Sequence, residues 1–301
     1  MEANNNFSIN NKEPIKQNTS IFNLRKIRNK YIIKQIFEHL NQKKFIKIIK
    51  YNKNIQNKLK INQNDYKKFC EIEIEIIPTE DKDYEEGIFI FFNNKEEKSY
   101  YHIYYDNSKE EAKRKHRNYK IIIDYQIKSF ENLFNKCKFI KKINFIKFNR
   151  NDINNMSYMF YGCESLTELN LSNFNTNDVT NMDSMFGGCK SLKELNLSNF
   201  NTNNVTNMKF MFCGCNSLKE LNLSNFNTIN VNNMTCMFSG CSSLKNLNLI
   251  NFKINKSTDM FHMFYKCLSI EELNISKTFY IGVKNHGDIC MPKKSKLKIK
   301  A

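Results

Sequence analysis

The chain has 301 residues, of which 41% are hydrophobic, so it can bury a sizeable core, and its apolar runs are too short to span a bilayer. The formal net charge of +17 is unevenly spread, because residues 1–69 carry 16 Lys and Arg against 4 Asp and Glu, whereas residues 156–233 carry 4 against 6. No basic and aromatic motif of the kind used on RNA or DNA appears, so nucleic acid is not the expected partner. The sequence shows no signal peptide or membrane anchor, and we expect an intracellular, cytoplasmic protein that does not bind a membrane.

Residues 1–20 are polar and Asn-rich, which predicts a disordered tail. Residues 21–69 follow with a helical pattern that favours a small cluster of short helices. The apolar face of its first helix holds Ile32, Ile33, Ile36, Phe37 and Leu40. The segment also resembles an F-box, since I-F-x-x-L is followed by Phe45 and an aliphatic helix, although the usual Leu-Pro at the start is missing. That resemblance implies that residues 21–60 bind the adaptor of a ubiquitin ligase.

Residues 70–129 change from a helical to an alternating pattern, which is typical of β-strands. We expect strands at residues 71–76, 87–92, 100–105 and 119–125. A stack of repeats needs a cover over its first hydrophobic turn, so this β-rich region is predicted to cap the repeats that follow.

Residues 130–285 contain six units of 26 residues without an insertion. Six cysteines fall in one column of the alignment: Cys137, Cys163, Cys189, Cys215, Cys241 and Cys267. The motif L-x-x-L-N-L predicts a short strand, because its leucines alternate with polar residues. The other half of the unit places Met182, Met185, Phe186 and Cys189 at the spacing of one helical stripe. An Asn stands just before the stripe and a Gly just before its cysteine, and both suit helix ends.

These patterns predict an α/β solenoid, a leucine-rich-repeat array of six strand-plus-short-helix units, preceded by the helical cluster and the β-rich cap. Residues 286–301 are predicted to add a cap strand with Ile299 in the register of Leu169, although their basic character is also typical of a targeting signal. The segment SLKELNLSNFNTNNVTNMKFMFCGC closely resembles the repeats of the BspA-like surface protein family. The resemblance implies a leucine-rich-repeat protein that binds other macromolecules and has no catalytic activity.

The sequence contains no candidate catalytic residue, no cofactor motif and no metal site. The cysteine column lies beside Met and Phe, so it is interpreted as a line of buried thiols, and no pair of Cys or His has the spacing of a zinc site. The five histidines form no metal-binding array, and no Gly-rich phosphate loop is present. An enzyme is therefore not expected.

Two surfaces are candidate binding sites for a protein partner. The first is the outward side of the strands, because stacked repeats present it as one continuous platform. Its residues are Glu168, Asn170, Glu194, Asn196, Glu220 and Asn222. The second is a ridge of aromatic residues on the predicted helices, with Tyr158, Phe210 and Phe261, which either pack over neighbouring coils or form a second interface.

The sequence thus predicts a non-enzymatic protein–protein interaction scaffold whose partner it does not identify. The alternative is an F-box-like substrate receptor of a ubiquitin ligase. In that case the helical segment would bind the ligase adaptor and the repeats would hold the client protein.

Overall fold

The computed structural model divides the chain into two compact units, residues 1–61 and 62–301. The residues that the structure describes are 57, 72–79, 101–105, 119–123, 127–148, 150, 152–255, 257–285, 289–290 and 296–300. The predicted tail at 1–20, the helical segment at 21–69 apart from residue 57, and the predicted strand at 87–92 lie outside the described residues. The fold described here is therefore that of the second unit.

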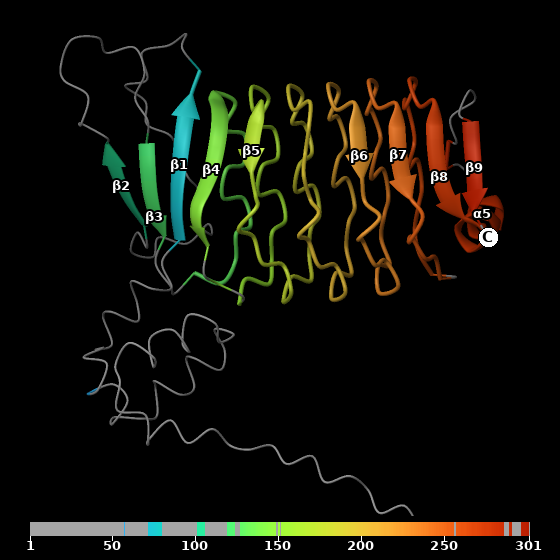
Figure 1. The fold of residues 1–301 in the computed structure, drawn as a ribbon, viewed down its shortest axis with the longest axis horizontal. Coiled ribbons are helices and arrows are strands. Elements are labelled where there is room, and N and C mark those ends of the chain that lie inside the picture. The colour runs from blue at the N-terminus through green and yellow to red at the C-terminus, as the bar shows by residue number, and fades with distance from the viewer. Residues whose placement is uncertain are drawn as a thin grey trace, which may run out of the picture. The chain divides into compact units, whose positions relative to one another are not determined.

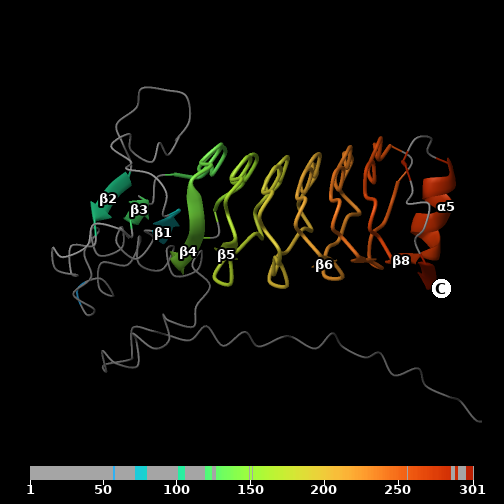
Figure 2. The same ribbon diagram turned by 90° about the horizontal axis from the view of Figure 1, so that it is seen from above.

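The repeats form a stack of coils, each of 26 residues, that lie side by side along one axis (Figures 1 and 2). Parallel bridges join equivalent residues of successive coils, such as Asn155 with Asn181 and Asn181 with Asn207. The strands of the repeats are β4 (Ile140–Phe148), β5 (Glu168–Asn170), β6 (Glu220–Asn222), β7 (Asn246–Leu249) and β8 (Glu272–Ser276). Neighbouring strands pair in parallel with a shift of one repeat, so Leu221 lies opposite Leu247 and Leu247 opposite Leu273.

The predicted α/β solenoid is wrong, because none of the repeat segments expected to be helical forms a helix among the residues that the structure describes. The segments expected to be helical are consecutive turns, and the helix α5 (Lys277–Asn285) follows the last repeat strand. The strands also do not form one continuous sheet. They belong to two separate sheets, with the strand orders β2-β3-β1-β4-β5 and β6-β7-β8-β9.

The turn segment fails to form a helix because its amides bond to the next coil. The amides of Met182, Ser184 and Phe186 donate to carbonyl oxygens of the following coil over 2.8–3.0 Å. The amide of Met185 donates to the carbonyl of Met182, three residues back, over 3.3 Å. In a helix that starts at Met182, the amide of Phe186 would instead donate to the carbonyl of Met182, four residues back.

The backbone angles of this segment are those of repeated tight turns. Ser184 and Gly188 have φ values of 54° and 73°, as the third residue of a type II turn requires. Asn181 does cap the segment as expected, but its Oδ1 accepts a hydrogen bond from the amide of Asp183 over 3.0 Å, two residues on. That bond makes an Asx turn rather than a helix cap.

The core confirms the burial pattern although the helices are wrong. Met182, Met185, Phe186 and Cys189 are each 0% exposed. A column of phenylalanines runs through all the coils as nearly parallel rings, with centroids 5.6–5.7 Å apart. Each coil thus buries its apolar side chains against its two neighbours, as the repetition predicts.

The first coil is covered by antiparallel strands. β1 (Ile72–Pro78) pairs with β4 on one side and with β3 (Tyr119–Ile123) on the other, and β2 (Tyr101–Tyr105) pairs with β3. Ile72, Ile74 and Ile76 are buried, so this sheet continues the core beyond the first repeat.

The last strand, β9 (Lys296–Lys300), pairs in parallel with β8. Leu297 lies opposite Leu273 and Ile299 opposite Ile275, so the register is two residues from the expected one. The backbone gives the reason. Ile289 still occupies a repeat position, because its carbonyl accepts a hydrogen bond from Phe264 as that of Met263 does from Phe238. The coil is therefore two residues shorter between Ile289 and β9.

Candidate functional site

The strand face is the outward side of β4 to β8 and of the coil between β5 and β6. The alternation of the strand motif sends its leucines into the core and its other side chains outward. All six residues predicted for partner binding are exposed there: Glu168, Asn170, Glu194, Asn196, Glu220 and Asn222. The structure therefore brings the predicted residues together on one surface, in successive coils.

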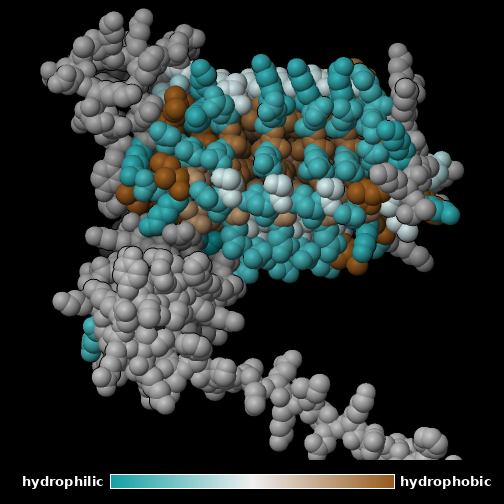
Figure 3. Space-filling model, in the orientation of Figure 1, coloured by the Kyte–Doolittle hydropathy of each residue, from teal (hydrophilic) through white to brown (hydrophobic). Residues whose placement is uncertain are grey.

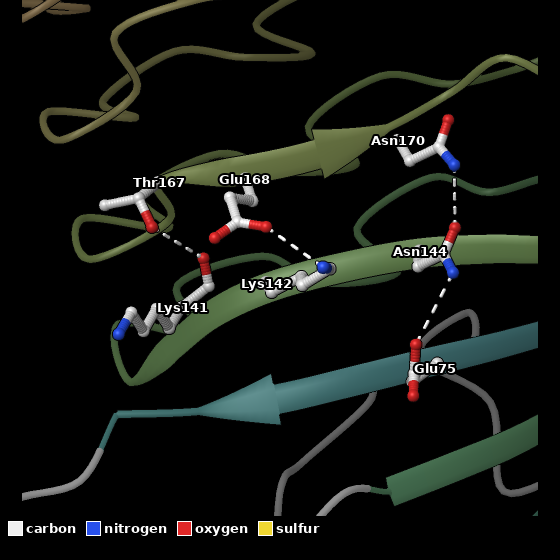
Figure 4. A network of polar contacts seen from close by, with 7 residues as sticks. All are labelled: Glu75, Lys141, Lys142, Asn144, Thr167, Glu168 and Asn170. Carbon is white, nitrogen blue, oxygen red and sulfur yellow. Dashed lines mark hydrogen bonds and ion pairs between the residues drawn. The ribbon is translucent and has the colours of Figure 1, made fainter.

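At the amino-terminal end of the strand face, polar side chains of neighbouring coils form ion pairs and hydrogen bonds with each other (Figure 4). Glu168 forms an ion pair of 3.0 Å with Lys142 of the preceding coil. Asn170 donates a hydrogen bond of 2.8 Å to Asn144, whose amide donates to Glu75 of β1 over 3.4 Å. These contacts link the cap to the first two coils and occupy the polar groups there.

Polar side chains in the carboxyl-terminal part of the strand face are paired in the same way. Glu220 accepts a hydrogen bond of 3.0 Å from Asn246, and Lys245 forms an ion pair of 2.9 Å with Glu271. Glu272 forms an ion pair of 2.8 Å with Lys298 of β9. The charges at both ends of the face are thus largely neutralised by their neighbours.

The middle of the strand face differs, because its charged side chains have no such partners. The side chains of Lys193, Glu194 and Lys219 are exposed and form no ion pair or hydrogen bond with any residue that the structure describes. Here the sheet is also interrupted, since residues 193–197 belong to neither of the two sheets.

The strand leucines that lie between the polar side chains are most accessible to solvent in this middle part of the face. Leu169 and Leu195 are only partly buried, whereas the equivalent Leu221, Leu247 and Leu273 are at most 3% exposed. In Figure 3 a band of apolar residues is visible along the middle of this face, between rows of hydrophilic side chains. We call Leu169, Lys193, Glu194, Leu195 and Lys219 the central strip.

The predicted aromatic ridge is only partly a surface. Tyr158 and Phe210 are half-buried, whereas Phe261 is 48% exposed. Phe261 stacks on His262 with ring centroids 3.8 Å apart, and Lys209 lies over the ring of Phe210. Helical spacing predicts that these aromatic side chains point outward. The segment is a run of turns, so that spacing does not apply.

Ser184 and Gly187, which occupy the positions of Tyr158 and Tyr161 in the next coil, are buried. Tyr161 of the preceding coil covers Gly187, where a Cβ atom would lie 3.0 Å from the tyrosine ring. Part of the aromatic ridge therefore packs against the neighbouring coil.

The cysteine column is structural rather than reactive. The Sγ atom of Cys189 donates a hydrogen bond of 3.2 Å to the carbonyl of Phe160, and that of Cys215 donates one of 3.1 Å to the carbonyl of Phe186. Burial raises the pKa of Cys189 well above its ordinary value and that of Cys215 to about 12. Among the described residues no group of three or more His, Cys, Asp or Glu is placed to hold a metal ion.

Sequence reasoning missed a ladder of Thr and Asn side chains on the side of the coil that follows the strand. The Oγ1 of Thr202 donates to the carbonyl of Asn227 over 2.9 Å and accepts from the amide of Asn227 over 2.8 Å. Thr176 and Asn201 form the same pair of bonds one coil earlier. The repeated letters N-F-N-T were the available signal, since a polar residue repeated inside a buried column needs a partner in the next coil.

A stack of 26-residue coils with an uninterrupted core and an exposed strand face defines a repeat protein. Two segments, residues 128–222 and 193–290, match the family model described as "Mycoplasma protein of unknown function, DUF285". They cover more than half of the chain, which therefore belongs to this family. No curated protein and no solved structure matches the chain. Within the described residues no helix is both long and apolar enough to cross a membrane.

Proposed function

We propose that the chain is a non-catalytic scaffold that binds a protein partner on its strand face. The observation that supports this proposal is the central strip, where accessible apolar side chains and charges without internal partners occur together. Elsewhere on the face most charged side chains are already paired.

The energetics of binding favour the central strip over the rest of the face. A partner that covers Leu169 and Leu195 removes apolar surface from water, which contributes roughly 25 cal/mol for each Å² buried. Lys193, Glu194 and Lys219 can pair with the partner without first breaking an internal ion pair. At Glu168 or Glu272 an internal ion pair would have to break before the residue could pair with the partner, so the binding free energy would gain little.

The proposal is tested by reversing the charge of three strand-face residues together, Glu168→Lys, Glu194→Lys and Glu220→Lys. We first isolate a partner with the wild-type chain as bait, purify it, and measure its Kd for each variant by calorimetry. A loss of at least about tenfold, which corresponds to roughly 1.4 kcal/mol, is expected. The melting temperature should change little, because exposed ion pairs contribute about 0–1 kcal/mol.

The control introduces three lysines on another exposed column, Thr180→Lys, Thr206→Lys and Asn232→Lys. This variant should bind the partner as the wild type does. Unchanged binding by the strand-face variant would place the partner site elsewhere on the chain.

We also propose that the repeats are related to those of BspA-like surface proteins, because they share the 26-residue period and its motif. An intracellular location completes the proposal, because the described cysteines are free thiols, the usual state in a reducing compartment. Cell fractionation with an antibody against the chain tests this location.

A further inference from the structure

Two of the described cysteines outside the buried column lie in the turns, at the edge of the stack. Cys213 and Cys236 are partly exposed free thiols in neighbouring coils. Neither packs in the phenylalanine core, and neither belongs to the strand face. Their position has no role in the proposed partner binding.

The stacking of the coils places the two residues close together. The amide of Cys213 donates to the carbonyl of Phe210, and the amide of Phe210 donates to the carbonyl of Thr235, the residue before Cys236. Phe210 therefore lies beside Cys236 in the next coil and is the first residue of the turn that ends at Cys213.

The preceding pair of coils shows how closely the two positions approach each other. Gly187 and Phe210 are the equivalents of Cys213 and Cys236 one repeat earlier. A Cβ atom at Gly187 would lie 3.3 Å from the carbonyl oxygen of Phe210. By equivalence, the Cβ of Cys213 is in van der Waals contact with the backbone of Cys236, and the two thiols are close enough to interact electrostatically. A disulfide needs Cβ atoms about 3.8 Å apart, a separation that this backbone contact allows.

The surroundings of the two thiols include groups that raise their pKa values and groups that lower them. The pKa of Cys236 is raised by burial first and then by the nearby thiol of Cys213, while Lys209 lowers it and Asp259 and Cys290 raise it. The pKa of Cys213 is raised by burial and lowered by its hydrogen bond with Ser239. Because both pKa values lie above the ordinary value, thiol exchange should be slow near neutral pH and should become faster as the pH rises.

We propose that Cys213 and Cys236 form a dithiol that closes reversibly to a disulfide between two neighbouring coils. A small disulfide such as oxidised glutathione supplies the oxidising equivalents. One thiolate attacks a glutathione sulfur and releases one glutathione thiol, and the second thiolate then displaces the other. The two cysteines lose two protons and two electrons, and one oxidised glutathione becomes two reduced molecules.

The first test treats the native full-length chain with oxidised glutathione and maps its disulfides after alkylation and digestion with trypsin. Cleavage after Lys209, Lys219 and Lys245 places Cys213 and Cys236 on separate peptides. We expect these two peptides to be joined. Each also carries one buried column cysteine, so the variants Cys213→Ser and Cys236→Ser identify the bonded thiols by losing the cross-link.

The matched control is Cys290→Ser, which removes an exposed thiol and should leave the cross-link intact. Separate glutathione adducts on Cys213 and Cys236 in the wild type, or a dominant disulfide to Cys290, would overturn the proposal.

A second measurement needs no oxidation. Phenylarsine oxide joins two close thiols through arsenic and releases one water. We expect the native chain to bind one equivalent, and either serine variant of the pair to bind none. Equal binding by Cys236→Ser and wild type would show that the two thiols do not act together. This outcome concerns only the turn edge, so the strand-face proposal would stand.

Discussion

The Thr and Asn ladder makes a prediction about how the coils are held together. Thr202 is 1% exposed and forms two hydrogen bonds to Asn227 of the next coil, one as donor and one as acceptor. Thr202→Val keeps a branched side chain but removes both bonds. Two bonds at about 1 kcal/mol each, plus the cost of leaving groups of Asn227 without a partner, predict a loss of about 2–4 kcal/mol.

Two further variants separate the bonds from packing. Thr202→Ser keeps both bonds and loses one methyl group, which should cost about 1 kcal/mol. Thr206→Val removes the hydroxyl of an exposed threonine, whose Oγ1 donates to the carbonyl of Thr180 over 3.2 Å. The amide of Thr206 still donates to the same carbonyl in that variant, so the loss should stay below about 0.5 kcal/mol.

The measurement is urea unfolding followed by far-ultraviolet circular dichroism, with the free energy of unfolding obtained by linear extrapolation. The reasoning is refuted if Thr202→Val destabilises no more than Thr206→Val. It is also refuted if Thr202→Ser destabilises as much as Thr202→Val, because the methyl group would then account for the whole effect.

Two other predictions concern the turns. Gly188 and Gly214 share a φ of 73°, but a Cβ would lie 3.3 Å from the backbone of Gly162 in the first case and no closer than 3.7 Å in the second, so Gly188→Ala should destabilise by more than the roughly 1–2 kcal/mol expected of Gly214→Ala. Equal losses in urea unfolding would contradict the steric argument. If the aromatic ridge is a second interface, Phe261→Ser should remove self-association in analytical sedimentation without lowering the melting temperature, since this side chain is 48% exposed. A wild-type chain that sediments as a monomer at high concentration would exclude self-association there.

The burial of the repeats could be predicted from the sequence, but the backbone that produces it could not. Apolar residues at offsets 0, 3, 4 and 7 fit one face of a helix, and in the structure they fit a run of tight turns equally well. The spacing records only which side chains face the core. Whether an amide such as that of Phe186 bonds within its own segment or to the next coil depends on stacking, which no local pattern contains.

One local signal fits the turns as well as it fits a helix end. Gly162, Gly188, Gly214 and Gly240 recur at the seventh position of the segment and have φ values of 70–76°. The third position is left-handed as well, but it holds residues such as Tyr158 and Ser184 that rarely adopt this conformation. Hydrogen bonds to the next coil impose this left-handed conformation, so the residue types at the third position do not predict it.

The candidate site shows a similar division. The exposure of Glu194 and Asn196 follows from strand alternation and could be predicted. The interruption of the sheet at residues 193–197 could not, because the letters of this coil are nearly those of the next one. The difference between paired and unpaired charges arises from neighbours a repeat away, such as Lys142 for Glu168 and Asn246 for Glu220.

The buried cysteine column makes the stability of the stack sensitive to alkaline pH. Burial raises the pKa of Cys215 from 9.0 to about 12. The folded chain therefore holds this proton more tightly than the unfolded chain, so the stability is fully present below pH 9 and is lost as the pH rises toward 12. Each pH unit in that window removes up to about 1.4 kcal/mol for each such thiol.

The variant Cys215→Ala isolates this contribution from the titration of lysine and tyrosine. It lowers the stability at pH 7, because it leaves a small cavity and removes the hydrogen bond to the carbonyl of Phe186. Above pH 9, however, its free energy of unfolding should fall less steeply than that of the wild type, by up to about 1.4 kcal/mol per pH unit. The two slopes are compared by urea unfolding between pH 8 and pH 10.5, a range that brackets the ordinary thiol pKa of 9.0. Parallel slopes would mean that Cys215 titrates alike in the folded and unfolded chains, and the column would then not be a line of buried thiols.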